Sequence, residues 1–438
     1  MILILRDVKQ VMSTTLFLVF FIGVIFGVPV AGALGFGAIV ALFLEGRSLT
    51  TIAQRLFTGV DSMALMALPF FILAGELATK TDIMDRLLDL ANLLVGKLRG
   101  GLAYVSIVAS MLFAGISGAA NADAAGIGSV LIPAMKGDYG SKFSVTINSI
   151  SSIVGPIIPP SIAVILYALV SPGASVTGLF MAGFLPGILI GLTLMVTTYL
   201  VVPKYYTGET QQQQKQEKAF KVIYRSVPAL LVPVIILGGI LGGVFTATEA
   251  GAVAVAYCLL YGLINRASGF TINKLFLAIR QCLLLSSMCF LIISTASMAS
   301  WIFAYEGLPG SIEAILLTVT DSPWFFLLLA NIILLFAGTI LDTTALIVLF
   351  APIMTPIAVS FGIHPVHFGI VFVFSSLIGN TTPPIGGTLM VSCGIGKVSI
   401  EEVVPVMLPY YLCLIVALIL ITYLPFITLW LPKITGII

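Results

Sequence analysis

Two ten-residue stretches, 224 residues apart, combine hydroxyl side chains, a glycine and paired prolines within very apolar surroundings. They read Ser151-Ser152-Ile153-Val154-Gly155-Pro156-Ile157-Ile158-Pro159-Pro160 and Ser375-Ser376-Leu377-Ile378-Gly379-Asn380-Thr381-Thr382-Pro383-Pro384. Proline lacks an amide hydrogen and glycine frees the backbone, so each stretch must break a helix and leave carbonyl oxygens unpaired. Lipid cannot satisfy such carbonyls, whereas a cation or a polar solute can. The pair predicts a binding site at membrane depth; an ordinary packing kink is the alternative.

Two short polar groups separate pairs of apolar limbs that are too short to cross a bilayer. In the first half, limbs 101–116 and 122–136 flank Ser117-Gly118-Ala119-Ala120-Asn121. In the second half, a similar pair lies within 323–354 and turns near Gly338. A transmembrane helix needs roughly 20 residues. Each pair is therefore expected to form a re-entrant hairpin whose small, polar tip turns back inside the protein.

Hydroxyl, amide, carboxylate and backbone carbonyl oxygens are hard ligands that suit a small cation such as Na⁺. In the first half the candidate ligands are Ser117, Gly118, Asn121, Asp123, Ser151, Ser152, Gly155 and Pro156. In the second half they are Gly338, Thr339, Asp342, Thr343, Gly379, Asn380, Thr381 and Thr382. Asp123 and Asp342 are the only acidic residues in the hairpin limbs. Each could be a cation ligand, a cap on the second limb of its hairpin, or both.

The composition places these motifs in a membrane. Of 438 residues, 59% are hydrophobic and only 9% are charged, which leaves too little polar surface for a soluble protein. The cysteines lie in or beside apolar runs at spacings that favour free packing thiols over disulfides or a metal site. His364 and His367 share one loop without an acidic or cysteine partner nearby, and we expect both to be solvated. No nucleophile–base pair stands at membrane depth, so we expect no enzyme.

Matching segments divide the chain into two similar halves. Asp123, Pro133 and Met135 recur at one constant offset as Asp342, Pro352 and Met354. The first half, 1–205, is expected to hold scaffold helices within 12–98, the hairpin 101–136, a broken helix 143–170 and a span 178–202. The second half, 227–438, is expected to hold scaffold helices within 228–320, the hairpin 323–354, a broken helix 366–391 and a span 405–430. A hydrophilic cytoplasmic linker, 206–226, would join them.

Each half contains an odd number of full crossings, so the halves must enter the membrane from opposite sides. The expected fold is an all-α integral membrane protein built as an inverted repeat. Arg99, Lys136 and Lys142 flank the first hairpin, whereas 281–396 contains no Lys or Arg. The positive-inside rule then places the mouth of the first hairpin in the cytoplasm and that of the second outside. The first apolar run lacks a convincing cleavage site, and we expect a retained membrane helix.

Six motifs spread over nearly the whole chain resemble those of one transporter family. They are Leu112-Phe113-Ala114-Gly115-Ile116-Ser117-Gly118, Ile132-Pro133-Ala134-Met135, Gly155-Pro156-Ile157-Ile158-Pro159-Pro160-Ser161, Gly243-Val244-Phe245-Thr246-Ala247-Thr248-Glu249-Ala250, Leu341-Asp342-Thr343-Thr344 and Thr382-Pro383-Pro384-Ile385-Gly386. As a set they are similar to the large membrane subunit (M subunit, DctM-like) of TRAP (tripartite ATP-independent periplasmic) transporters. The chain departs from the usual pattern at Ala119-Ala120-Asn121 and at Asn380-Thr381.

The resemblance implies an elevator-type secondary transporter of a bacterial or archaeal inner membrane that uses Na⁺ as its coupling ion. Substrates of the family carry a carboxylate, commonly C4-dicarboxylates or sialic acids. Two partners are implied, a small four-helix membrane subunit and a periplasmic substrate-binding protein. Both hairpins and both broken helices would move against the remaining spans. A stand-alone carboxylate or ion exchanger is the alternative.

The substrate is expected to lie between the two hairpin tips. The candidate substrate-binding residues are Asn121, Pro159, Pro160, Thr382, Pro383 and Gly386. No Lys or Arg lies at the predicted centre, so an anion would be held by helix N-termini and bound cations.

Overall fold

The computed structural model describes residues 10–208, 218–265 and 269–438. Every regular element in these ranges is a helix. Seven helices are long and apolar enough to cross a membrane, and a further group of apolar helices is shorter. The expected class, an all-α multi-pass membrane protein, is confirmed. The central part of the predicted linker lies outside the described residues, as do Arg6 and Lys9, two basic residues before the first apolar run.

The first half holds nine α-helices within its described part. In chain order they are α1 (Val11–Ile25), α2 (Val30–Leu44), α3 (Leu49–Thr58), α4 (Ala67–Lys80), α5 (Ile83–Val95), α6 (Gly101–Ser117), α7 (Ala120–Ser151), α8 (Ile162–Val170) and α9 (Val176–Tyr205). Helices α6 and α7 form the first hairpin. Helix α7 continues through a kink at Gly140, whose φ is +75°, into the first part of the broken helix.

The second half repeats this order. Its helices are α10 (Ala219–Leu241), α11 (Ala247–Ile264), α12 (Ile272–Tyr305), α13 (Leu308–Leu317), α14 (Pro323–Gly338), α15 (Thr343–Ser360), α16 (Pro365–Asn380), α17 (Gly387–Gly396), α18 (Ile400–Tyr423) and α19 (Pro425–Ile434). Helices α14 and α15 form the second hairpin, and α16 and α17 form the second broken helix. Helix α10 begins before the predicted end of the linker at 226.

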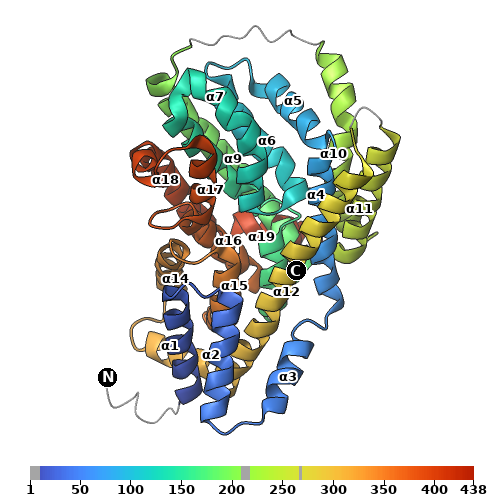
Figure 1. Cartoon of the computed structure of the whole chain (residues 1–438). Coiled ribbons are helices and arrows are strands. Elements are labelled where there is room, and N and C mark those ends of the chain that lie inside the picture. The colour runs from blue at the N-terminus through green and yellow to red at the C-terminus, as the bar shows by residue number, and fades with distance from the viewer. Residues whose placement is uncertain (1–9, 209–217, 266–268) are drawn as a thin grey trace.

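The two halves lie in opposite orientations (Figure 1). The first hairpin occupies the upper part of the view, whereas the second occupies the lower part. The opening helices are placed likewise, with α1 and α2 below and α10 and α11 above. Between the halves, α7 packs against α17 and α15 packs against α8. Each hairpin therefore contacts the broken helix of the other half, as expected for an inverted repeat.

Both broken helices are interrupted where the prolines stand. The first resumes at α8, where the Ser161 hydroxyl accepts a hydrogen bond from the amide of Val164 at 3.1 Å. The second stops at Asn380 and resumes at Gly387. The intervening prolines cannot donate to the carbonyls before them, which ends the regular hydrogen bonding. The N-termini of α8 and α17 consequently lie inside the protein, where their first amides need partners.

Ahead of the hairpins, one corresponding pair of segments differs between the halves. Helix α12 is continuous over 34 residues within the scaffold segment predicted at 228–320. In its place the first half has α3, a connection that includes a short 3-10 helix (Met63–Met66), and α4. The interruption begins at Gly59, where an added Cβ would lie 2.4 Å from the Cβ of Ser297 on α12. A close crossing of the two segments therefore needs glycine at this point.

The expectation that both histidines are solvated is wrong for His367. This side chain is buried within α16, with Nδ1 2.7 Å from the hydroxyl of Thr428 and Nε2 3.1 Å from the carbonyl of Thr422. The expectation failed because α16 begins at Pro365 and α19 packs against it. His364 precedes the helix, and its Nδ1 accepts from the amide of Val366 at 3.2 Å.

Candidate functional site

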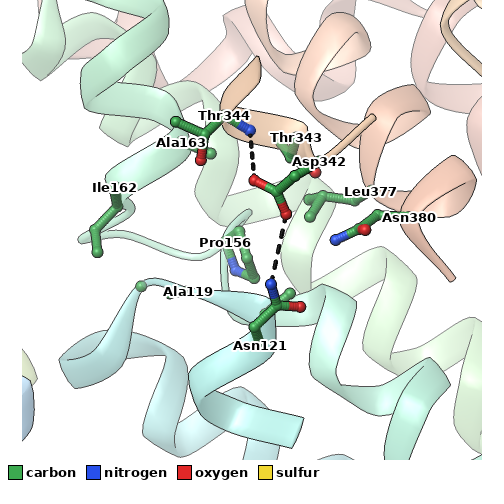
Figure 2. A pocket seen from close by; sticks show the side chains of 12 residues that line it. Ala119, Asn121, Pro156, Ile162, Ala163, Asp342, Thr343, Thr344, Leu377 and Asn380 are labelled. Atoms are coloured by element: carbon green, nitrogen blue, oxygen red, sulfur yellow. Dashed lines mark hydrogen bonds between the residues drawn. The ribbon is translucent and has the colours of Figure 1, made fainter. Parts of the chain in front are cut away.

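A cavity lies where both hairpin tips meet both helix breaks (Figure 2). About 370 Å³ of empty space lies between its walls, a volume that includes the open mouth and the solvent there. The lining comes from both halves: Gly118, Ala119, Ala120, Asn121, Pro156, Ile162, Ala163, Asp342, Thr343, Thr344, Leu377 and Asn380. Asp342 is the only charged side chain among these described residues.

Each hairpin tip is bound to the helix break of its own half by the same kind of backbone contact. In the first half, the carbonyl of Gly118 accepts from the amide of Ile162 at 3.2 Å. In the second half, the carbonyl of Thr339 accepts from the amide of Ile385 at 3.2 Å. These bonds satisfy amides that the broken helices leave without partners. The repeat is therefore preserved in the backbone contacts that build the site.

Glycines allow the tips to approach the breaks closely. Gly118 has a φ of +61°, and an added Cβ would lie 2.6 Å from the carbonyl oxygen of Pro160. In the second half, an added Cβ on Gly379 would lie 2.6 Å from the Cα of Gly338. A side chain at these positions would force the hairpin away from the break.

Asp342 faces the cavity from the second tip (Figure 2). Its Oδ2 accepts from the amide of Thr344 at 3.0 Å, so the carboxylate caps α15. Its Oδ1 receives a long hydrogen bond of 3.5 Å from Nδ2 of Asn121 on the first tip. The capping role that the sequence left open therefore applies to Asp342, and the exposed carboxylate is also available to a cation.

Asp123 is completely buried behind the first tip. Its Oδ1 accepts a hydrogen bond from the hydroxyl of Ser117, whereas Oδ2 has no partner among the described residues. The same Oδ2 lies against Gly155, where an added Cβ would come within 1.9 Å of it. Asp123 does not cap α7, because Ala119 holds the cap position. At membrane depth, an unpaired carboxylate oxygen is stabilised when it coordinates a bound cation.

Asn148 connects the first hairpin with both broken helices. Its Nδ2 donates to the carbonyl of Ala124 and to the hydroxyl of Ser392, both at 2.9 Å. The hydroxyl of Ser152 donates to the carbonyl of Asn148 at 2.6 Å. The Oδ1 of Asn148 is buried without a partner among the described residues. It supplies a second unpaired oxygen, on a side chain that is hydrogen-bonded to Ala124, the residue after Asp123.

A chain of side-chain hydrogen bonds joins the second break to the first tip. The amide of Gly387 donates to Oδ1 of Asn380 at 3.0 Å. The Nδ2 of Asn380 donates to the hydroxyl of Thr388 at 3.2 Å, and that hydroxyl donates to Oδ1 of Asn121 at 2.9 Å. The chain holds two carboxamides of the cavity in defined orientations.

The structure places the predicted site residues in three settings. Cavity-lining positions are occupied by Gly118, Asn121, Pro156, Asp342, Thr343 and Asn380. Positions packed behind the lining are occupied by Ser117, Asp123, Ser151, Ser152, Gly155, Gly338, Thr339, Gly379 and Thr381. The remaining candidates do not line the cavity: Pro159, Pro160, Thr382, Pro383 and Gly386. The assignment of each predicted site residue to the substrate or to an ion stays a prediction.

Three further residues that support the site were not singled out from the sequence. They are Asn148, Thr388 and Tyr411, whose hydroxyl donates to the carbonyl of Thr381 at 2.5 Å. Asn148 could have been found as an amide one helical turn before the serine pair. Thr388 follows two glycines at the restart of a broken helix, where a polar side chain can reach the break. Tyr411 carries no comparable local signal.

Comparison with protein families finds one match. The family described as Tripartite ATP-independent periplasmic transporter, DctM component, matches residues 17–427. The chain is 36% identical to the sialic acid TRAP transporter large permease protein SiaM of Vibrio cholerae, covering 94% of this chain and 96% of that protein. It is 33% identical to the C4-dicarboxylate TRAP transporter large permease protein DctM of Rhodobacter capsulatus, with the same coverage.

Comparison with solved structures finds a shared fold. The YdaH transporter of Alcanivorax borkumensis, described as having an unusual topology, matches with a TM-score of 0.58 at 14% identity. The match covers 85% of this chain and 87% of that one. MtrF of Neisseria gonorrhoeae matches with a TM-score of 0.56 at 17% identity, covering 87% of this chain and 83% of that one.

Proposed function

The chain belongs to the DctM component family of the tripartite ATP-independent periplasmic transporters, and we propose that it is the large permease of a Na⁺-coupled importer of an organic acid. The observation that carries the proposal is the cavity shared by both halves, with two carboxylates at or beside it. Such a cavity can bind a solute and coupling cations together, which coupled transport requires.

The proposed substrate is a small organic anion of the C4-dicarboxylate or sialic acid class. Relatives are named for sialic acid, C4-dicarboxylates, 2,3-diketo-L-gulonate and isethionate. No lysine or arginine is among the described lining residues, so the anion must be held by amides, hydroxyls and neighbouring cations. The N-terminus of α8 contributes Ile162 and Ala163 to the lining, and a helix N-terminus favours negative charge.

Two Na⁺ sites are proposed, one in each half. The first would use the free Oδ2 of Asp123 with the hydroxyl of Ser117 and carbonyls of the break near Gly155. The second would use the carboxylate of Asp342, the hydroxyl of Thr343, which is buried without a partner among the described residues, and carbonyls near Thr381. Oxygen donors of these kinds suit Na⁺. A cation beside Asp342 would also offset its repulsion of an anionic substrate.

Movement is proposed to follow an elevator mechanism. The hairpins α6–α7 and α14–α15, together with the broken helices, would carry the cavity across the membrane against a scaffold of the remaining spans. The first hairpin would open to the cytoplasm and the second to the outside, in an inner membrane. The complete transporter would include a small membrane subunit and a periplasmic substrate-binding protein, as the family description implies.

Reconstituted uptake tests the proposal. The full chain, its small subunit and its binding protein are placed in liposomes, and uptake of succinate, sialic acid, 2,3-diketo-L-gulonate and isethionate is measured. We expect uptake of at least one probe, only with an inward Na⁺ gradient and only with the binding protein. Uptake that ignores Na⁺ would contradict the coupling. Uptake without the binding protein would favour a stand-alone exchanger.

A further inference from the structure

Thr388 connects the side chains of two cavity residues without lining the cavity itself. It is the second residue of α17 and is completely buried. Its hydroxyl donates to Oδ1 of Asn121 at 2.9 Å and accepts from Nδ2 of Asn380 at 3.2 Å. Asn121 lies at the first hairpin tip and Asn380 at the second break, so one hydroxyl group joins the two halves.

These contacts fix the orientation of both amides. A hydroxyl has a single hydrogen to donate, and here it goes to the oxygen of Asn121, which turns the nitrogen of Asn121 toward Asp342. The oxygen of Asn380 accepts from the backbone amide of Gly387 at 3.0 Å, which leaves its nitrogen on the other side. Figure 2 shows the nitrogens of Asn121 and Asn380 on the inner side of the cavity lining.

The fixed orientation presents hydrogen-bond donors to the cavity. A primary amide carries two N–H groups. Each amide nitrogen donates one hydrogen bond, to Asp342 or to Thr388, and keeps a second N–H that no described residue accepts. Because no basic side chain is among the described lining residues, these N–H groups are suited to bind carboxylate or sulfonate oxygens. A reversed amide would instead present a carbonyl oxygen, which repels an anion.

We propose that Thr388 is a positioning residue that sets the specificity of the cavity for oxyanions. By holding Asn121 and Asn380 with their N–H groups inward, it makes the cavity bind an anionic oxygen group and disfavours neutral analogues. The inference rests on the proposed function, because it assigns this role within the same transport site. It adds the residue that decides how the two amides face the substrate.

The test compares Thr388→Val, which has nearly the same shape but no hydroxyl, with Thr388→Ser, which keeps the hydroxyl. Each full-length variant is reconstituted with its two partners, and KM and maximal rate are measured for the probe that the wild-type complex takes up. A hydrogen bond to a charged group is worth roughly tenfold or more in affinity. We expect Thr388→Val to raise KM about tenfold with the maximal rate within about twofold, since only binding is weakened. Thr388→Ser keeps the hydroxyl, and its KM should lie within about twofold of the wild-type value.

A second variant keeps the inference testable if Thr388→Val folds poorly. Asn121→Asp retains the size of the side chain and removes its N–H donors, and we expect a KM at least about tenfold higher for the same anionic probe. Two outcomes would overturn the inference and leave the proposed function intact. One is an unchanged KM for Thr388→Val, even where less of the protein folds, and the other is an unchanged KM for Asn121→Asp. Absence of wild-type uptake for all four probes would instead overturn the proposed function, and this inference with it.

Discussion

Asp123 and Asp342 occupy matching places in the two repeats, yet their surroundings differ. Both precede a matching proline by the same interval, but α7 has already completed a turn at Asp123, whereas α15 only begins after Asp342. Asp123 is therefore buried with one oxygen unpaired, and Asp342 is exposed to the cavity. A buried carboxylate depends more strongly on a cation partner than an exposed one. If both proposed Na⁺ sites exist, the one at Asp123 is expected to be the tighter.

The contact between Asp123 and Gly155 gives a direct test of that site. In Gly155→Ala the new methyl carbon would lie 1.9 Å from Oδ2 of Asp123, so the carboxylate must turn away from its place. We expect the Na⁺ concentration for half-maximal uptake to rise about tenfold, as for loss of one charged ligand. Gly394→Ala is the matched control, because an added Cβ there has nothing within 4 Å. Equal Na⁺ dependence in both variants would argue against an ion site at Asp123.

At the scale of elements, local chemistry decided which helices could be predicted. The two breaks and the two hairpins were expected because proline, glycine and short apolar limbs act within a few residues. Helix α3 lies within the scaffold segment predicted at 12–98 but is not an apolar run, and the interruption before α4 depends on contact with Ser297 of α12. Local patterns mark Thr388 and Asn148 as polar residues beside the breaks, but their partners depend on which helices pack together and could not be predicted.

Asp82 and Glu306 occupy similar places in the two repeats, each shortly before the short helix that precedes a hairpin. Each side chain accepts hydrogen bonds from an opening helix of the other half. Before α5, Asp82 accepts from Nε of Arg86 at 2.8 Å and from the hydroxyl of Tyr261 on α11 at 2.7 Å. Before α13, the two oxygens of Glu306 accept from the first amides of α1, each at 2.8 Å. The segment that precedes each hairpin is thus tied to an opening helix of the other repeat through a carboxylate.

The contact of Glu306 with α1 predicts a loss of stability on mutation. Its carboxylate satisfies the amides of Met12 and Ser13, and α1 has no side-chain cap of its own. Glu306→Ala should therefore lower the free energy of unfolding by about 1 to 2 kcal/mol, as for loss of a helix cap. Thermal unfolding of the purified chain in detergent measures the effect. Glu313→Ala on α13 is the control, expected within about 0.5 kcal/mol of wild type. Equal melting temperatures for the two variants would show that the contact is not stabilising.

At the scale of the whole molecule, the contacts between the two halves determine which helices can move relative to the others. Helices α4 and α11 pack together, as do α2 and α12, and these pairs join the two halves within the proposed scaffold. The first hairpin meets that scaffold where Gly115 of α6 contacts Pro233 of α10, and an added Cβ on Gly115 would lie 2.6 Å from the Cβ of Pro233. An elevator movement must separate these two residues, whereas contacts inside the scaffold persist.

Cross-linking across the hairpin–scaffold boundary tests the movement. In a background without the native cysteines, the pair Gly115→Cys and Pro233→Cys should form a disulfide on oxidation once α6 and α10 move slightly apart, because the two Cβ positions lie 2.6 Å apart and a disulfide needs about 3.5 to 4.5 Å. Uptake should then fall to background and return on reduction. The control pair is Gly35→Cys and Thr295→Cys, where an added Cβ on Gly35 lies 3.6 Å from that of Thr295, within the scaffold. This distance suits a disulfide, and cross-linking there should leave uptake unchanged. Continued uptake with Gly115 and Pro233 positions cross-linked would mean that the hairpin does not slide past α10, and the substrate would have to cross by local opening of the tips instead.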